Sequence, residues 1–212
     1  VNIYRYFSKA NIWPRGFPLE HIKDDVPDLA RLEQAQADCP IQQHLADGNP
    51  DVDAVYRLAM PLPQRFSKET QVALGPGSWC PFNSQNTTWF AQAFALLYLP
   101  AYCSFRMTDI WRSFVAQRIA HINGWSILFG GPTMKQERNW HDLLKDFEDE
   151  VPGYLHNSRI RDALESLSLK AGEENISENI LCCYEKLVSM SLVGPEELKL
   201  LAAWLEDLKQ SK

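Results

Sequence analysis

The sequence has no hydrophobic run long enough to cross a lipid bilayer. The longest apolar stretch, residues 89–99, is interrupted by Gln92 and stops at Pro100, whereas a membrane-spanning helix needs about 20 apolar residues. The chain starts at Val1, without an initiator methionine or a signal or transit peptide. Either processing or cloning has removed an upstream part, or the chain is a piece of a longer protein. We expect no membrane segment within the chain as written.

An excess of basic residues and a cysteine framework are also missing. The 21 lysines and arginines stand against 27 aspartates and glutamates, a net charge of −6, which argues against a general nucleic-acid binder because such a protein needs a basic face. The five cysteines are an odd number without a CxxC pair, so we expect reduced, buried thiols. The sequence holds no P-loop, dinucleotide-binding or nucleophile-elbow motif.

Hydrophobic periodicity and turn residues predict a mixed α/β body with a helical C-terminal region. Prolines keep the first 30 residues extended. We expect a helical turn at 39–46, a strand or helix at 51–58, a strand at 72–74, helices at 86–99 and 109–121 and a buried strand at 125–129. Helical patterns follow at 143–147, 160–169, 176–193 and 196–208. We therefore divide the chain into regions 1–156 and 157–212.

The polar run SWCPFNSQNT at residues 78–87 is a candidate binding segment. A tryptophan face can stack on a sugar ring, and amide side chains offer both donors and acceptors, which makes Trp79, Asn83 and Gln85 candidates for sugar contacts. The alternative is a loop before a helix, in which Asn83, Ser84 or Asn86 caps the first turn.

Asp109 lies at the expected start of a helix that Thr108 can cap, between Arg106 and Arg112. An aspartate is common there because its charge favours the positive end of the helix. The alternative is functional, because neighbouring arginines can bind a diphosphate or hold a carboxylate ionised as a base.

Metal ligation has two weaker candidates. His141 follows the buried strand and its Gly-Gly turn, although a single histidine is more often structural or solvated. Asp51-Val-Asp53 is similar to the two-carboxylate metal motif of nucleotide-sugar enzymes, but it follows a polar turn rather than an apolar strand.

Several strings of this sequence resemble, in the same order, the STELLO-type family of glycosyltransferases. They are WPRGFPL (13–19), PDVDAVYR (50–57), WCPFNSQNT (79–87), FRMTDIWR (105–112) and QERNWHD (136–142). The resemblance runs from about residue 2 to residue 155. A more distant similarity is to the reversibly glycosylated polypeptides, which are UDP-arabinopyranose mutases.

The resemblance implies a GT-A-like glycosyltransferase fold, of which this chain corresponds to the acceptor-side half. It implies a metal-dependent enzyme of polysaccharide biosynthesis that moves a sugar from a UDP-type donor to a glycan or another hydroxyl acceptor. Mn²⁺ or Mg²⁺ would then be held mostly by residues upstream of Val1. Plant members of the family are anchored in the Golgi membrane, whereas relatives without an anchor would be cytoplasmic.

The same resemblance assigns roles to individual residues. Asp109 matches the acidic position at a helix start and would orient or deprotonate the acceptor hydroxyl. Arg106 and Arg112 would secure Asp109 or offset diphosphate charge. His141 corresponds to a late metal-ligating histidine, and Trp79, Asn83 and Gln85 would hold the acceptor sugar.

Two other interpretations remain open. One is a non-catalytic binding or assembly module that keeps the fold without the chemistry. The other is a stand-alone hydrolase that uses Asp51, Asp53 and Asp109, although the surrounding loops suit metal carboxylates poorly.

Overall fold

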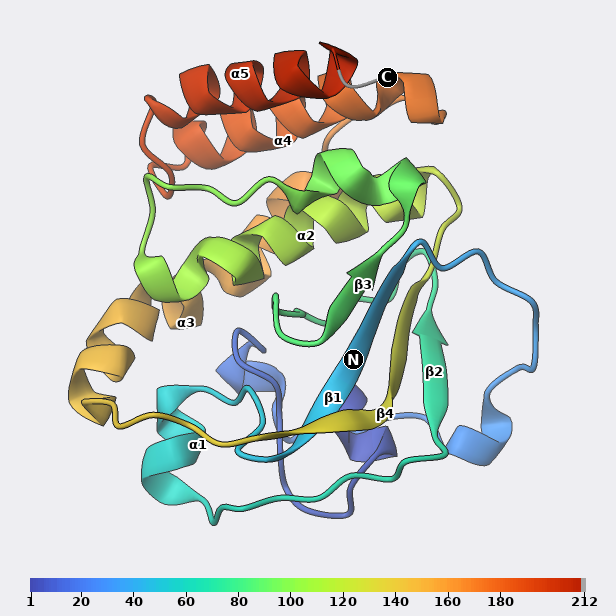
Figure 1. The fold of residues 1–212 in the computed structure, drawn as a ribbon, viewed down its shortest axis with the longest axis vertical. Coiled ribbons are helices and arrows are strands. Elements are labelled where there is room, and N and C mark those ends of the chain that lie inside the picture. Colours follow the sequence, from blue (N-terminus) through green and yellow to red (C-terminus); the bar gives the residue numbers. More distant parts are fainter. Residues whose placement is uncertain (211–212) are drawn as a thin grey trace.

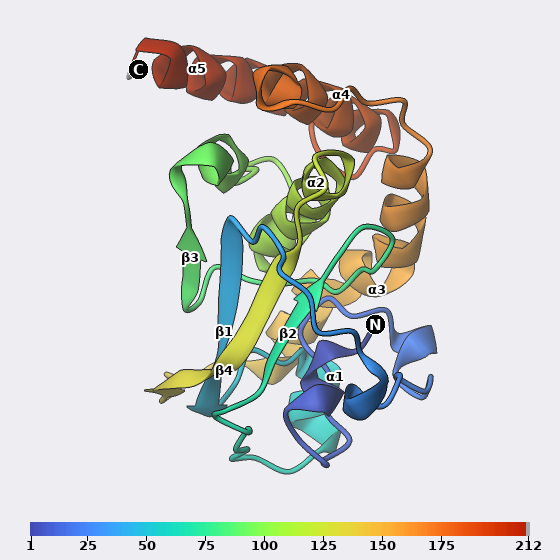
Figure 2. The same ribbon diagram turned by 90° about the vertical axis from the view of Figure 1, so that its right-hand side faces the viewer.

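Two parallel strands at the centre of a four-stranded sheet organise the molecule, whose computed structural model describes residues 1–210. The strands are β1 (Ile41–Gly48), β2 (Gln71–Leu74), β3 (Thr87–Trp89) and β4 (Ile127–Gln136), in the order β2-β4-β1-β3. The central strands β1 and β4 run parallel, and each has an antiparallel partner at the sheet edge. Because the two central strands are parallel, their carboxyl ends lie together at one end of the sheet, the lower end in Figure 2. Helix α1 (Ala54–Ala59) follows β1.

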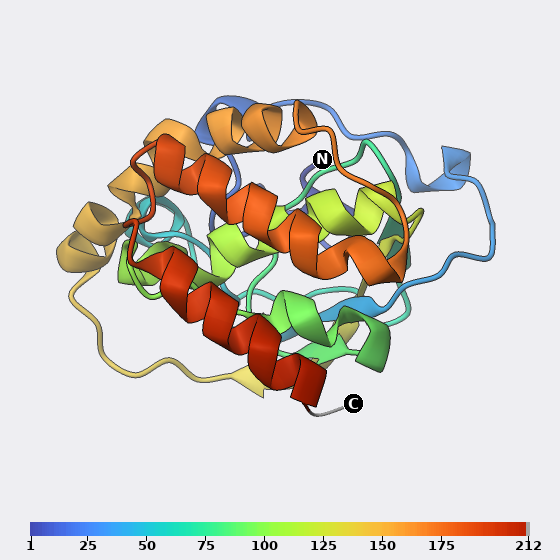
Figure 3. The ribbon, with the colours of Figure 1, turned by 90° about the horizontal axis from the view of Figure 1, so that it is seen from above.

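Four further helices complete the fold, and one of them lies between the sheet and the two C-terminal helices (Figure 1). They are α2 (Thr108–Ile122), α3 (Leu143–Glu165), α4 (Ile176–Ser189) and α5 (Glu197–Gln210). Short 3₁₀ helices occupy Ile3–Tyr6, Leu19–His21, Leu29–Arg31, Ala91–Leu97, Phe105–Met107 and Glu173–Asn175. Helices α4 and α5 run side by side in opposite directions, and α4 packs on α2 (Figure 3). The expected mixed α/β fold with C-terminal helices is confirmed.

The prediction for residues 39–46 was wrong, because they form the central strand β1 rather than a helical turn. The polar residues Gln42, Gln43 and His44 hide the alternation that marks a strand in a sequence. Hydrogen bonds to neighbouring strands stabilise this segment as a strand, since β1 is paired with β4 along its length and with β3 at its start. The buried Gln43 side chain accepts a hydrogen bond from the Asn83 amide at 3.0 Å, so its polar groups are satisfied inside the fold.

The helix expected at 86–99 was also wrong. Asn86 has a positive φ of 54°, a conformation that interrupts a helix, and its side chain donates to the Leu45 carbonyl at 3.0 Å. The chain then forms β3 against β1, followed by a 3₁₀ helix at Ala91–Leu97.

Helix α2 confirms the helix expected at 109–121, but the Thr108 cap is absent. The Thr108 hydroxyl donates to the Phe105 carbonyl at 3.2 Å and makes no side-chain bond to the free amides of the helix. The preceding 3₁₀ turn, Phe105–Met107, leads directly into α2, so the helix does not begin at an extended capping residue.

Helix α3 joins two segments that the sequence suggested were separate, and it continues through Pro152. Its first amides, of Leu144 and Lys145, donate to the Asp142 carboxylate at 3.0 and 3.2 Å. The expected boundary between residues 156 and 157 falls inside this helix. Side chains from α3, α4 and α5 belong to the same hydrophobic cluster as those of the sheet and α2.

The structure also bears on the expectations about membrane segments and cysteines. No helix among residues 1–210 is long and apolar enough to span a membrane. All five cysteines are free; Cys80 and Cys183 are buried, whereas Cys39, Cys103 and Cys182 are half-buried.

Gly16 fixes the approach of the N-terminal loop to α2. It has a φ of 81°, and a Cβ at this position would overlap Cγ2 of Ile110. Its carbonyl accepts a hydrogen bond from the Asn157 side chain of α3 at 2.7 Å. Glycine is suited here both because it tolerates a positive φ and because it leaves room for the first turn of α2.

Gly16→Ala should therefore destabilise the protein more than Gly124→Ala. Gly124 also has a positive φ, 71°, but a Cβ there would meet nothing within 4 Å. The control should lose about 1 kcal/mol from backbone strain, and Gly16→Ala should lose about 1–3 kcal/mol more from overpacking. Urea denaturation measures both free energies of unfolding, and equal losses would contradict close packing at Gly16.

Candidate active site

Charged residues from three segments gather at the carboxyl edge of the β1–β4 pair. Asp51 and Asp53 follow β1, Arg138 and His141 follow β4, and Asp109 lies in the first turn of α2. In open α/β sheets, the carboxyl ends of parallel strands are the usual place for a ligand site. This edge is therefore the first place to look for chemistry.

The buried side chain of Arg15 bridges two carboxylates. Its Nη2 donates to both oxygens of Asp109, at 3.0 and 2.9 Å, and its Nε donates to both oxygens of Asp51, at 3.0 and 3.1 Å. Burial opposes charge on each partner, yet the two aspartates raise the pKa of Arg15 well above its usual value. Burial likewise opposes ionisation of Asp51, but Arg15 lowers its pKa below the usual value.

A second ionic group lies beside the first and ties α3 to the start of α2. Arg106 donates to Oε1 of Glu150, from Nη2 at 2.5 Å and from Nε at 3.0 Å. The fully buried Glu150 also accepts from the Ala54 amide at 2.7 Å and the Tyr154 hydroxyl at 2.6 Å. The Arg15 Nη1 donates to the Arg106 carbonyl, which joins the two groups.

Asp146 connects this group to His141. Its carboxylate pairs with Arg138 and lies 3.8 Å from Nε of Arg106. His141 Nδ1 lies 3.4 Å from Oδ1 of Asp146, and its side chain is 41% exposed. Contacts through Arg15, Arg106 and Asp146 thus connect Asp109 to His141.

Asp53 has a structural role in the fold. Its carboxylate accepts from the Trp13 indole at 2.6 Å and from the Tyr56 amide at 2.7 Å, which caps α1. Burial raises the pKa of Asp53 to about 6, against the lowering effect of those two hydrogen bonds, and the nearby Glu150 and Asp51 charges add to the rise.

Arg112 lies inside the protein and contacts Asp109 through an intermediate. The side chain of Arg112 donates to the Ser84 hydroxyl at 3.1 Å, and the Ser84 amide donates to Oδ2 of Asp109 at 3.1 Å. The guanidinium carbon lies 4.7 Å from the ring centroid of Trp89. Burial lowers the pKa of Arg112, and the residue is 3% exposed. Arg112 therefore supports the loop beside Asp109 and barely reaches solvent.

Asn83 and Gln85 shape that same loop. The Asn83 side chain accepts from the Gln85 amide at 2.8 Å, and the Gln85 carbonyl accepts from the Gln43 side chain at 2.5 Å. Asn83 is buried and Gln85 is half-buried. These bonds hold the backbone of Ser84 in place to donate to Asp109.

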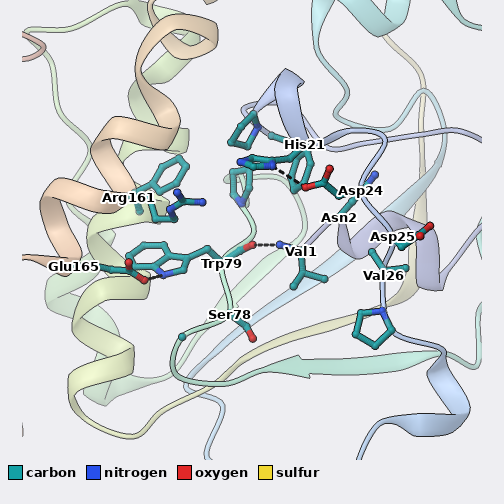
Figure 4. Close-up of a pocket in the computed structure, with 16 residues that line it drawn as sticks. Val1, Asn2, His21, Asp24, Asp25, Val26, Ser78, Trp79, Arg161 and Glu165 are labelled. Carbon is teal, nitrogen blue, oxygen red and sulfur yellow. Dashed lines mark hydrogen bonds and ion pairs between the residues drawn. The ribbon is translucent and has the colours of Figure 1, made fainter.

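Trp79 lies apart from the ionic groups, in a cavity of about 470 Å³ between α3 and the N-terminal loops (Figure 4). Its indole nitrogen donates to Glu165 of α3 at 2.6 Å, and its ring stacks on Phe114. Asp24 and Arg161 line the cavity as well, whereas Asp109 does not. The structure therefore separates Trp79 from the other candidate residues.

The described residues, 1–210, contain no group of three or more histidine, cysteine, aspartate or glutamate side chains placed to hold a metal ion. The carboxylates of Asp51 and Asp109 both pair with Arg15.

Sequence reasoning missed Arg15, Asp146 and Glu150. Arg15 lies in an extended loop with no periodicity, so nothing local indicates that it crosses to α2. The two carboxylates lie four residues apart in α3, where acidic residues are usually solvated. The only available signal was the position of Arg15 within the family-like string at residues 13–19.

Comparisons with known proteins agree on one family. The profile of the STELLO glycosyltransferases matches residues 106–212. Two Arabidopsis thaliana proteins, described as probable glycosyltransferases STELLO2 and STELLO1, are 30% and 28% identical over 98% of this chain. The aligned region covers 28% and 27% of those proteins, so the chain spans a little over a quarter of their length.

Replacing Arg15 with Met should cost about 3–5 kcal/mol of unfolding free energy near pH 7, because it leaves two buried carboxylates without their cation. The loss should shrink between pH 7 and pH 4. In the wild type, the pKa of Asp51 is lowered, so the stability that this ion pair gives is kept down to the ordinary aspartate pKa of about 4 and is lost only below it. In the variant, burial without Arg15 raises the pKa of Asp51, so this carboxyl takes up a proton between pH 7 and pH 4 and the variant regains stability there.

Urea denaturation at several pH values measures this difference. Arg5→Met is the control, because Arg5 is exposed and its side chain donates to the Asp24 carbonyl at 2.8 Å. If Arg15→Met loses little unfolding free energy, or loses the same amount at pH 7 and at pH 4, then Arg15 does not stabilise the ionised forms of Asp51 and Asp109.

Proposed function

Because the chain belongs to the STELLO glycosyltransferase family, we propose that the protein containing it transfers a sugar from a UDP-type donor to a hydroxyl group of a glycan or similar acceptor. The chain would supply the acceptor side of a GT-A-like active site. The observation that carries this proposal is the position of Asp109, a partly accessible carboxylate fixed at the carboxyl edge of the parallel strands.

The contacts of Asp109 suit it to orient an acceptor hydroxyl. Arg15 and the Ser84 amide hold its oxygens, while its side chain remains 15% exposed. A carboxylate oxygen accepts more than one hydrogen bond, so an acceptor hydroxyl could donate to the accessible edge. There Asp109 would position the hydroxyl and take its proton as the bond to the sugar forms.

The neighbouring residues support this role in different ways. Arg106 is 13% exposed and would offset diphosphate charge as the leaving group departs. Arg112, Asn83 and Gln85 would act through the loop that carries Ser84. Trp79, in its separate cavity, would contact a more distant part of a long acceptor.

His141 would be one ligand of Mn²⁺ or Mg²⁺, with the remaining ligands supplied by other parts of the protein. Metal-binding histidines usually donate one ring nitrogen to a carboxylate and bind through the other, and the Nδ1 contact with Asp146 leaves the half-exposed ring in that arrangement. The ion would neutralise charge on the donor diphosphate.

Asp109→Asn in the intact protein should reduce sugar transfer by about 10²- to 10⁴-fold, the usual range for loss of a general base. Asp51→Asn is the matched control, because Asp51 is also paired with Arg15 and is equally accessible, at 14%. It should lose comparable stability and keep transfer within about tenfold. A folded Asp109→Asn protein with wild-type transfer rates would remove Asp109 from the mechanism.

Calorimetry separates this function from the assembly-module alternative. The intact protein should release heat when titrated with UDP-sugars and Mn²⁺. Absence of both binding and transfer would favour a module that keeps the fold without the chemistry.

His141→Ala should weaken Mn²⁺ binding by the intact protein at least tenfold, since it removes a ligand. His21→Ala is the control, because His21 is 39% exposed and its Nδ1 also faces a carboxylate, that of Asp24 at 2.7 Å. Manganese titration followed by electron paramagnetic resonance measures both affinities. Equal affinities for the two variants would exclude His141 as a ligand.

A further inference from the structure

The side chain of Gln43, on the central strand β1, bonds the main chain on both sides of Ser84. Its Oε1 accepts from the Asn83 amide at 3.0 Å, and its Nε2 donates to the Gln85 carbonyl at 2.5 Å. A side-chain amide can make both bonds at once because it contains a donor and an acceptor. Gln43 is 5% and Asn83 6% exposed, so water does not readily replace a hydrogen bond that is lost here.

The two residues that follow Gln43 on β1 hold the far end of the same loop. The His44 amide donates to the Asn86 carbonyl at 3.0 Å, and the Leu45 carbonyl accepts from the Asn86 side chain at 3.0 Å. Ser84, between these attachments, bonds the first turn of α2 instead. The loop therefore transmits the position of the central strand to the start of α2.

The hydrogen bonds of Asp109 are divided unevenly between its two oxygens. Oδ2 accepts from the Ser84 amide at 3.1 Å and from Nη2 of Arg15 at 2.9 Å. Oδ1 accepts from Nη2 of Arg15 at 3.0 Å and from no other described residue. Since each carboxylate oxygen has about two lone-pair sites, Oδ2 is fully occupied and Oδ1 keeps one site free.

We propose that Gln43 is a positioning residue for Asp109: it holds the Ser84 amide on Oδ2 and thereby leaves Oδ1 to meet the acceptor hydroxyl. This inference rests on the proposed function. In that reaction the hydroxyl proton passes to Oδ1 and the hydroxyl oxygen bonds the anomeric carbon of the sugar. The bond from that carbon to the diphosphate oxygen breaks, and its electron pair leaves with UDP.

Loss of the Gln43 contacts should misplace the reacting oxygen without removing it. If the Ser84 amide moves off Oδ2, both oxygens of Asp109 have a free site and the carboxylate can turn about its Arg15 contact. A displacement of about 1 Å at a reacting group can cost about 100-fold in rate.

Gln43→Met keeps the length of the side chain and removes both hydrogen bonds. In the intact protein it should lower kcat for sugar transfer about 10- to 100-fold and leave KM for the acceptor within about threefold, because the lost contact acts in the transition state. The probes are UDP-glucose and UDP-galactose as donors, with maltose, cellobiose and lactose as acceptors, and released UDP is measured.

Gln43→Glu covers the case in which Gln43→Met does not fold. It keeps the oxygen that accepts from the Asn83 amide, whereas its ionised carboxylate cannot donate to the Gln85 carbonyl. Its kcat should fall at least threefold, again at an unchanged KM.

Gln42→Met is the matched control. Gln42 is the preceding residue of β1, is half-buried, and donates from its side chain to the Cys39 carbonyl at 3.3 Å. Successive side chains of a strand point to opposite faces of the sheet, so Gln42 does not share the contacts of Gln43. This variant should keep kcat within about twofold of the wild type.

Hydrogen exchange at the Ser84 amide provides a readout that does not depend on transfer. Mass spectrometry of overlapping peptides that cover Ser84 measures it in the intact protein. Exchange should become at least tenfold faster in a folded Gln43 variant, because the amide loses its bond to Asp109, and should stay unchanged in Gln42→Met. The proposal requires both faster exchange and lower kcat, so either change without the other overturns it, as does a raised KM at unchanged kcat.

Failure of the proposed function gives a different result. If the wild type transfers no sugar with any of these probes, that outcome counts against the enzyme, and the assignment of Oδ1 falls with it. Faster exchange at Ser84 in the Gln43 variants would then still show that Gln43 holds the Ser84 amide on Asp109, and unchanged exchange would refute that as well.

Discussion

The site depends on one buried cation. Arg15 comes from an extended N-terminal loop and pairs at the same time with Asp51, after the central strand, and Asp109, at the start of α2. Two carboxylates this close and this buried would repel each other without a positive charge between them. Arginine suits the position because its planar fork can bond two carboxylates from different edges, which a lysine cannot do. The position of Gly16 directly behind it lets the loop approach α2 closely enough for the bridge to form.

The carboxylates that α3 brings to this end of the sheet are likewise neutralised by arginines. Glu150 and Asp146 each contact an arginine, and the Arg106 carbonyl joins their group to Arg15. Buried ion pairs add little net stability because desolvation offsets their attraction, but losing one partner is costly. What the network supplies is therefore position: it fixes the start of α2, the start of α3 and the segment after β4 relative to one another. Asp109 lies on the first of these segments and His141 on the third.

The sequence predicted the elements whose pattern is local and missed those that depend on distant partners. Helices α2, α4 and α5 and the short strand β2 were predicted, since each has its own apolar periodicity. Strand β1 was missed because its polar residues are satisfied only by pairing with β3, β4 and the loop at Asn83. In the site, Asp109 and His141 came from the family resemblance and from a helix start, whereas Arg15 and Glu150 give no local signal. Trp79 was grouped with the polar run beside it, and the fold turns its ring into a separate cavity.

We propose that Asp109, held by Arg15, faces the acceptor of a sugar-transfer reaction in the protein that contains this chain. A crystal structure of the intact protein with a bound acceptor disaccharide tests this most directly. We expect a sugar hydroxyl within about 2.6–3.2 Å of an Asp109 carboxylate oxygen, the reach of a general base, with the contacts of Arg15 to both aspartates retained. An acceptor bound elsewhere, such as in the Trp79 cavity with no hydroxyl near Asp109, would contradict it.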